Sequence, residues 1–224
     1  MLRGEPKETV MIPRFKGGKR RAFAAPSSAA GLAVLTAGAL WSMPAEPDPV
    51  IRVEEEWELV LNDPHVDRVS PQFTTVMSPF PNMDSYYAQI LWNHRETPEF
   101  TPGGIQLHSY REETLLRMRS VEWRTLSTQA ETIRWTQSLE TDGVSLTVSI
   151  QDGHSTTWGS FGRDMHISSS ANLADLGQYR PDFSAANACV SFGSNRVESL
   201  VLKRVRYYGR DGLIAEDNAP RRVM

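Results

Sequence analysis

The sequence has a single cysteine, Cys189, among its 224 residues. One cysteine excludes an intramolecular disulfide and a metal site built from several cysteines, so the stability of the chain has to come from its packed core. Cys189 lies in the apolar segment of residues 186–192, and no local Cys/His signature of a nucleophile accompanies it. We therefore expect Cys189 to be a buried small side chain.

The sequence also has little net charge and no long apolar run. Its formal charge of −3 argues against a nucleic-acid partner, because such binding depends on neutralising phosphates. The apolar stretch of residues 29–41 has 13 residues, which is too short for a helix that spans a bilayer. Neither nucleic-acid binding nor an integral membrane span is therefore expected.

The N-terminal segment differs from the rest of the chain. A basic cluster at residues 16–21 precedes the apolar stretch, and small residues follow at 42–45, which is the order of a secretory signal. This order predicts export or attachment to the cell envelope. In the alternative, residues 32–41 form the first strand of a cytoplasmic protein with a disordered basic tail. We divide the chain into a leader or tail (1–49), a β-domain (50–212) and a polar C-terminal tail that frays (213–224).

Recognisable catalytic motifs are lacking. The sequence has no P-loop, no dinucleotide-binding glycine pattern, no zinc-protease motif, no nucleophile elbow and no EF-hand loop. Its five histidines show no metal-ligand spacing. The acidic run of residues 54–58 is interpreted as a charged solvent face of a strand, and the pair Glu140 and Asp142 as turn chemistry. No catalytic residue and no metal ligand is assigned.

Alternation of apolar and polar residues is the strongest positive signal. It runs through residues 131–141 and 144–151, separated by Asp142 and Gly143. An Asp-Gly pair between two alternating runs predicts a β-hairpin with a type I′ turn, in which both central residues have positive φ. A second Asp-Gly pair at residues 152–153 predicts another turn, followed by a glycine-spaced loop that contains Trp158.

The remaining chain after residue 50 is predicted to form further short strands separated by Pro, Gly, Asn and Asp. The expected strands are residues 53–61, 72–77, 86–95, 105–111, 114–121, 188–192 and 197–208. Residues 165–182 are expected to be irregular, with a short helical turn at 173–176. Roughly nine to eleven strands at this spacing predict an all-β fold, a two-sheet antiparallel β-sandwich of jelly-roll type.

The polar faces of these strands carry hydrogen-bonding side chains rather than simple surface Lys and Glu. If the faces coincide on one concave sheet, they form a groove suited to polyhydroxyl or carboxylate-bearing ligands. In the alternative they are solvated faces of a structural domain, and Trp158 is a packing residue. The candidate ligand-binding residues are Gln89, Asn93, Arg95, Gln106, His108, Tyr110, Arg117, Arg134 and Trp158.

The pattern resembles the concanavalin A-like lectin and glucanase sandwiches, including their laminin G-like relatives. The resemblance rests on the hairpin of residues 131–151, the glycine-spaced loop at 156–162, and residues 195–198 leading into the strand at 199–208. It implies two curved antiparallel sheets over residues 50–212, in a class of domains that is often exported and often binds glycans. Calcium is a possible cofactor only through this resemblance, and no ligand residues for it can be mapped.

The chain departs from the glucanase members at their acidic triad, because Gly, Val and Ser follow Asp142. We therefore predict a non-catalytic carbohydrate-binding or cell-envelope module. One alternative is a polysaccharide hydrolase or lyase that would use His108, Tyr110 and Arg117. Another is a structural, self-assembling sandwich. The oligomeric state is left open.

Overall fold

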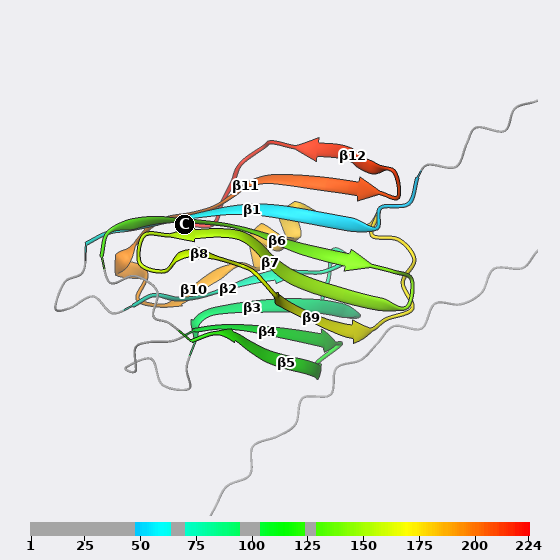
Figure 1. Ribbon diagram of the computed structural model, residues 1–224, viewed down its shortest axis with the longest axis horizontal. Helices are drawn as coiled ribbons and strands as arrows, with labels where there is room; N and C mark the ends of the chain where they lie inside the picture. The colour runs from blue at the N-terminus through cyan, green and yellow to red at the C-terminus, as the bar shows by residue number, and fades with distance from the viewer. Residues whose placement is uncertain (1–47, 64–69, 95–103, 124–128) are drawn as a thin grey trace, which may run out of the picture. The chain divides into compact units, whose positions relative to one another are not determined.

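The computed structural model describes residues 48–63, 70–94, 104–123 and 129–224. Nearly all of its regular elements are strands, and every strand pairing in it is antiparallel. Two sheets pack on one another (Figure 1), which confirms the predicted two-sheet antiparallel sandwich. The predicted leader lies outside the described residues, apart from its last two positions.

The larger sheet has eight strands, and the N-terminal strand β1 lies inside it between β6 and β11. Its strands, in spatial order, are β12 (Gly212–Asp217), β11 (Val197–Gly209), β1 (Arg52–Leu61), β6 (Glu131–Thr141), β7 (Ser145–Ser155) and β8 (Gly159–Phe161), with β13 (Arg221–Arg222) beside β11 and β9 (Met165–Ser170) beside β7.

The smaller sheet has five strands. In spatial order they are β10 (Cys189–Phe192), β2 (Gln72–Met77), β3 (Tyr86–His94), β4 (Gly104–Arg111) and β5 (Thr114–Glu122). The helix α1 (Pro181–Asn187) and a 3₁₀ turn at Ser194–Arg196 flank β10. Strand β5 forms one edge of this sheet.

The core between the sheets is centred on four aromatic side chains. Trp57 and Trp135 of the larger sheet stack at a centroid distance of 6.1 Å. Trp135 also contacts Phe73 at 5.9 Å and Trp92 at 4.4 Å, both from the smaller sheet. All four side chains are buried. The alternation predicted for β1 and β6 is confirmed, because it turns both tryptophans toward the opposite sheet.

The hairpin between β6 and β7 exists, but its turn differs from the prediction. Of Asp142 and Gly143, only Gly143 has positive φ (89°), whereas a type I′ turn needs it at both central residues. Positive φ at the first of the two central residues, Gly143 and Val144, is the pattern of a type II′ turn. The Asp142 carboxylate accepts hydrogen bonds from the backbone N–H of Val144 (2.9 Å) and Ser145 (2.6 Å), and these donors lower its pKa. The interpretation of Asp142 as turn chemistry is thus confirmed.

The second Asp-Gly pair does not form a turn. Asp152 and Gly153 lie inside β7, at a register shift opposite β6, so they form a bulge. Asp152 has positive φ (48°). Gly153 instead allows the backbone of β7 to lie close to the side chain of Phe161, because a Cβ atom at this position would lie 2.3 Å from the ring.

The C-terminal third holds three further corrections. Residues 165–170 form β9 rather than irregular chain, and the helix lies at Pro181–Asn187 rather than at residues 173–176. The tail expected to fray forms β12 and β13, which both pair with β11. Leu213 and Ile214 of β12 are exposed, so backbone pairing rather than side-chain burial accounts for this strand. Periodicity in a sequence does not report such pairing.

Candidate binding surfaces

The outer face of the smaller sheet brings together four of the predicted ligand-binding residues. Gln89 of β3 lies directly opposite His108 of β4. Gln106 and Tyr110 flank His108 at two-residue spacing, so their side chains share its face. Their chain neighbours, such as Leu107, point into the core. All four side chains are partly exposed.

Three of these side chains form a hydrogen-bonded row along β4. His108 Nε2 lies 3.2 Å from Gln106 Oε1, and His108 Nδ1 lies 3.2 Å from the Tyr110 hydroxyl. Because a carbonyl oxygen only accepts, Nε2 carries the proton that is donated to Gln106, and a neutral ring then accepts from Tyr110 at Nδ1. Among the described residues the amide nitrogen of Gln106 has no hydrogen-bond partner, so its donors are available to a ligand.

A pair of tyrosines continues this row. The rings of Tyr87 and Tyr110 stack at 4.8 Å with an angle of 7° between their planes. Burial raises the pKa of both hydroxyls, and for Tyr87 the neighbouring Tyr110 and Glu113 add to the effect, so both stay protonated at neutral pH. A surface hollow lies beside the pair. It is lined by Met83, Asp84, Tyr87, Glu112, Glu113 and Thr114.

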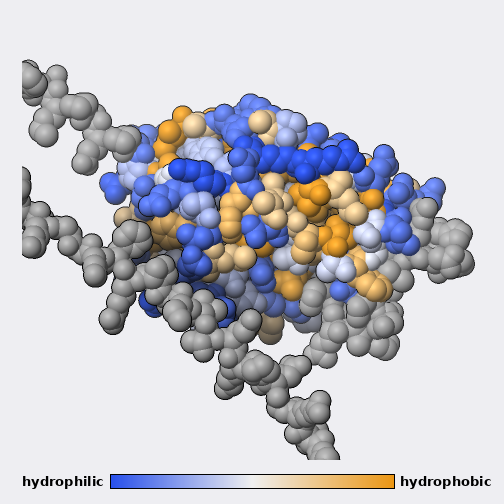
Figure 2. Space-filling view, turned by 180° about the vertical axis from the view of Figure 1, so that it is seen from behind, coloured by the Kyte–Doolittle hydropathy of each residue, from blue (hydrophilic) through white to orange (hydrophobic). Residues whose placement is uncertain are grey.

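Exposed apolar side chains of β5 lie next to the row on β4, on the same face of the sheet. Leu115 lies opposite Tyr110, and Met118 lies opposite His108. They are 45% and 59% exposed, so an apolar surface adjoins the polar row on this face. The side of the molecule turned away from the viewer of Figure 1 likewise carries apolar patches between hydrophilic ones (Figure 2).

Two other candidates are buried. Asn93 is 2% exposed, has positive φ (53°), and donates a 2.9 Å hydrogen bond to the carbonyl of Pro71. Trp158 is 6% exposed and packs edge-on against Phe161 in the core. The structure therefore places both side chains in packing and structural contacts, away from the row on β4.

The remaining candidates lie on other surfaces. Arg134 is on the outer face of the larger sheet, where it binds Glu58 at 2.8 Å. Arg117 projects from the opposite side of β5, because its cross-strand neighbour Ser109 is on the buried face. Arg95 lies outside the described residues. The described candidates therefore do not form one groove; they divide among two sheets and the core.

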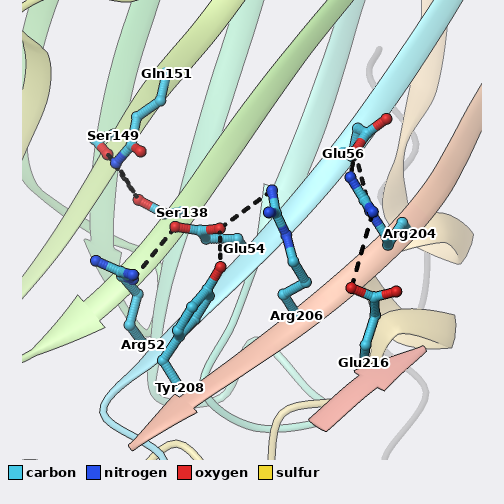
Figure 3. A network of polar contacts seen from close by, with 10 residues as sticks. All are labelled: Arg52, Glu54, Glu56, Ser138, Ser149, Gln151, Arg204, Arg206, Tyr208 and Glu216. Atoms are coloured by element: carbon cyan, nitrogen blue, oxygen red, sulfur yellow. Dashed lines mark hydrogen bonds and ion pairs between the residues drawn. The ribbon is translucent and has the colours of Figure 1, made fainter. Parts of the chain in front are cut away.

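The outer face of the larger sheet carries a network of ion pairs that we did not assign to a site from the sequence (Figure 3). Glu54 of β1 is paired with Arg52 and with Arg206 of β11, both at 3.3 Å, and accepts a 2.8 Å hydrogen bond from the Tyr208 hydroxyl. In the next row Arg204 binds Glu56 at 2.5 Å. Charges on neighbouring strands thus neutralise each other across this face.

Glu58, the third glutamate on this face of β1, is suited to ion pairing rather than to acid catalysis. Glu54, Glu56 and Glu58 alternate along β1, and evenly spaced carboxylates on one face are also what a glycosidase would need. A general acid, however, needs a raised pKa. Burial alone raises the pKa of Glu58, but the hydrogen bond from Arg134 and the charge of Lys203 outweigh it and lower the value. Glu58 is therefore ionised at neutral pH.

The fourth glutamate of the run lies in the core. Glu55 has no exposed surface, and its carboxylate accepts hydrogen bonds from Trp57 Nε1 (2.8 Å) and Gln137 Nε2 (2.6 Å). The hydroxyl of Tyr179, also buried, donates to its other oxygen. Burial raises the pKa of Glu55, and the four side-chain hydrogen bonds, including one from Ser184, oppose the shift. Polar residues at inward positions of two alternating strands were the sequence signal for this cluster.

Cys189 is exposed, so the prediction that it is buried is wrong. It begins the edge strand β10, in which Val190 rather than Cys189 packs against the core. Within the described residues, no group of three or more His, Cys, Asp or Glu side chains could hold a metal ion. No helix in that part of the chain is long and apolar enough to cross a membrane.

These placements leave the outer face of the smaller sheet as the surface with the most groups suited to a ligand. Comparison of the chain with protein-family models and with curated proteins finds no match.

Proposed function

We propose that the protein is a non-catalytic carbohydrate-binding module of the concanavalin A-like type. Its ligand would lie on the outer face of the smaller sheet, over Tyr87 and Tyr110. The observation that carries this proposal is the stacked tyrosine pair at the end of the row formed by Gln106, His108 and Tyr110. The two-sheet sandwich agrees with this superfamily but does not by itself indicate a function.

Sugar chemistry fits these groups. A pyranose has an apolar face of C–H groups, which can pack on an aromatic ring, and a rim of hydroxyls that both donate and accept hydrogen bonds. Gln89 and Gln106 offer amide groups to such hydroxyls, and Tyr87 offers the ring beside the hollow. The carboxylates that line the hollow can accept hydroxyl protons but would repel an anionic sugar. Neutral glycans are therefore the ligand class that we propose for this hollow.

Substituting Tyr87 with alanine is expected to weaken glycan binding about tenfold, because it removes the ring that lines the hollow. A panel of neutral and acidic glycans would be screened by affinity electrophoresis, followed by calorimetry on the best ligand. Gln106→Ala should weaken binding as well. The control is Tyr208→Ala, which removes a tyrosine from the opposite sheet and should leave binding unchanged.

Retention on no glycan would refute the proposal, and so would equal losses for Tyr87→Ala and Tyr208→Ala. New reducing ends or unsaturated products released from the same glycans would instead support the alternative of a polysaccharide-active enzyme.

We further propose that the module works outside the cytoplasm, on the strength of the charged, apolar and small-residue order in residues 16–45. The expected result is a mature N-terminus near Ala45 when the full-length chain is expressed in a bacterium and its extracytoplasmic fraction is sequenced. An intact Met1 on protein recovered only from the cytosol would contradict export.

A further inference from the structure

A second hollow lies between two edge strands that contact each other, β5 of the smaller sheet and β9 of the larger one. Arg119 of β5 joins the edges, because its Nη1 donates a 2.9 Å hydrogen bond to the carbonyl oxygen of His166. The hollow is lined by Leu116, Arg117, Met118, Arg119, His166, Ile167 and Ser168. Both arginines belong to this lining, and none of its residues is acidic.

The guanidinium of Arg117 is available for a ligand. Arg117 and Arg119 are two residues apart on β5, so both side chains leave the same side of the strand. Arg119 is held by His166, whereas Arg117 is exposed and makes no hydrogen bond or ion pair within the described residues. A guanidinium presents a planar set of N–H donors that matches carboxylate and sulfate oxygens.

An unsatisfied hydroxyl lies next to Arg117. Ser109 of β4 is its cross-strand partner, is 6% exposed, and its Oγ makes no hydrogen bond. Ser109 is not among the residues that line the hollow, so its hydroxyl is a feature of the buried face beside Arg117 and not a contact of the site. His166 and Ser168 line the β9 side of the hollow, and the Ser168 hydroxyl is hydrogen-bonded to Thr147 at 2.7 Å.

We propose that this hollow binds an oxyanion, the carboxylate or sulfate of an acidic glycan, with Arg117 as its main ligand and Arg119 as the fixed second charge. That the anion belongs to a glycan rests on the proposed function. That the hollow binds an oxyanion rests on the residues of the hollow alone. Inward-pointing charges on an edge strand also prevent sheets from pairing. Measuring self-association of the variants beside their affinity separates that role from anion binding.

The test measures affinity for alginate, which carries carboxylates, for dextran sulfate, and for uncharged dextran, with free glucuronate and sulfate as small probes. The wild-type protein is expected to bind both acidic polymers, more weakly as salt is added. Arg117→Gln should lower that affinity about tenfold, because it removes a charge-assisted contact. The matched control is Arg210→Gln, which removes the same charge from the exposed turn between β11 and β12.

Equal losses in Arg117→Gln and Arg210→Gln would overturn the site, because the effect would then be one of overall charge. Failure of the wild-type protein to bind either acidic polymer would overturn it too, even if free sulfate binds. If light scattering showed Arg117→Gln to associate while its affinity stayed unchanged, Arg117 would only protect the edge strand. Tyr87→Ala should leave binding of the anions unchanged. The proposed neutral-glycan site can therefore fail its own test without affecting the outcome of this one.

Discussion

Replacing Trp135 with alanine is expected to lower the free energy of unfolding by about 3–5 kcal/mol. The side chain is 1% exposed and contacts the rings of Trp57, Phe73 and Trp92, so its removal leaves a cavity between the two sheets. It also takes away the indole N–H that donates to Gln137 Oε1 at 3.2 Å. Domain stabilities are about 5–15 kcal/mol, so this one change removes a large part of the total.

Urea unfolding followed by circular dichroism would measure the loss without depending on tryptophan fluorescence. The chain offers a matched control, because Trp123 is 70% exposed, and Trp123→Ala should change the unfolding free energy by no more than about 0.5 kcal/mol. Trp135→Phe keeps an aromatic ring at the centre and should fall between the two. Similar losses for Trp135→Ala and Trp123→Ala would contradict the central position of Trp135.

Glu55→Leu is the second change for which we expect a large loss, about 3–5 kcal/mol. The substitution fills the site with an apolar side chain but removes the acceptor of the buried donors of Trp57, Gln137 and Tyr179. The Tyr179 hydroxyl can still bond to that of Ser184, which leaves the indole N–H of Trp57 and the amide of Gln137 without an acceptor. Each buried donor left without an acceptor costs about 1–3 kcal/mol. Glu55→Gln keeps the shape and one acceptor oxygen, and its amide can donate to the hydroxyl of Tyr179 or Ser184. The loss should therefore be smaller for Gln than for Leu.

The same residue should make stability depend on pH. Because burial raises the pKa of Glu55 in the folded state, the folded protein binds this proton more tightly than the unfolded chain does, whose value is near 4.5. The proton-linked stabilisation is complete below pH 4.5 and is lost as the pH rises through the folded-state pKa. Between pH 4.5 and the folded-state pKa of Glu55, the unfolding free energy of the wild-type protein should therefore fall relative to that of Glu55→Gln. Above that pKa the difference should stay constant.

Urea unfolding of both proteins at a series of pH values from 4 to 9 would test this dependence. Glu198→Gln, a change at an exposed position of β11, controls for the general effect of removing a carboxylate. If the difference in unfolding free energy between wild type and Glu55→Gln stayed constant with pH, folding would not shift the pKa of Glu55. Glu55 would then be an ordinary ionised carboxylate in the core.

The two outer faces of the sandwich differ in how far their polar side chains are already paired within the protein. On the larger sheet, the carboxylates of β1 are already paired with arginines of β1, β6 and β11, so a ligand would have to break existing ion pairs. On the smaller sheet, the amide of Gln106 and the ring of Tyr87 are partly exposed. A ligand at the proposed site would therefore displace water rather than protein contacts.

Local features were predicted well. The strands at residues 72–77 and 114–121 agree with β2 and β5 within one residue, because alternation and the residues that end a strand act over a few neighbours. The turn type at Gly143 was missed. The Asp-Gly pair fixes where the chain reverses, but the register between β6 and β7 decides which two residues are central.

The sequence by itself determined the fold class of this protein, the hairpin of β6 and β7, and the row of Gln106, His108 and Tyr110, because side chains two apart on a strand share a face. Only the tertiary structure decided which faces meet. It separated Arg117 from that row, and it joined Glu55 to Gln137, which is 82 residues away in the chain. The physical reason is that strand order and register depend on the packing of the whole core, which no local pattern encodes.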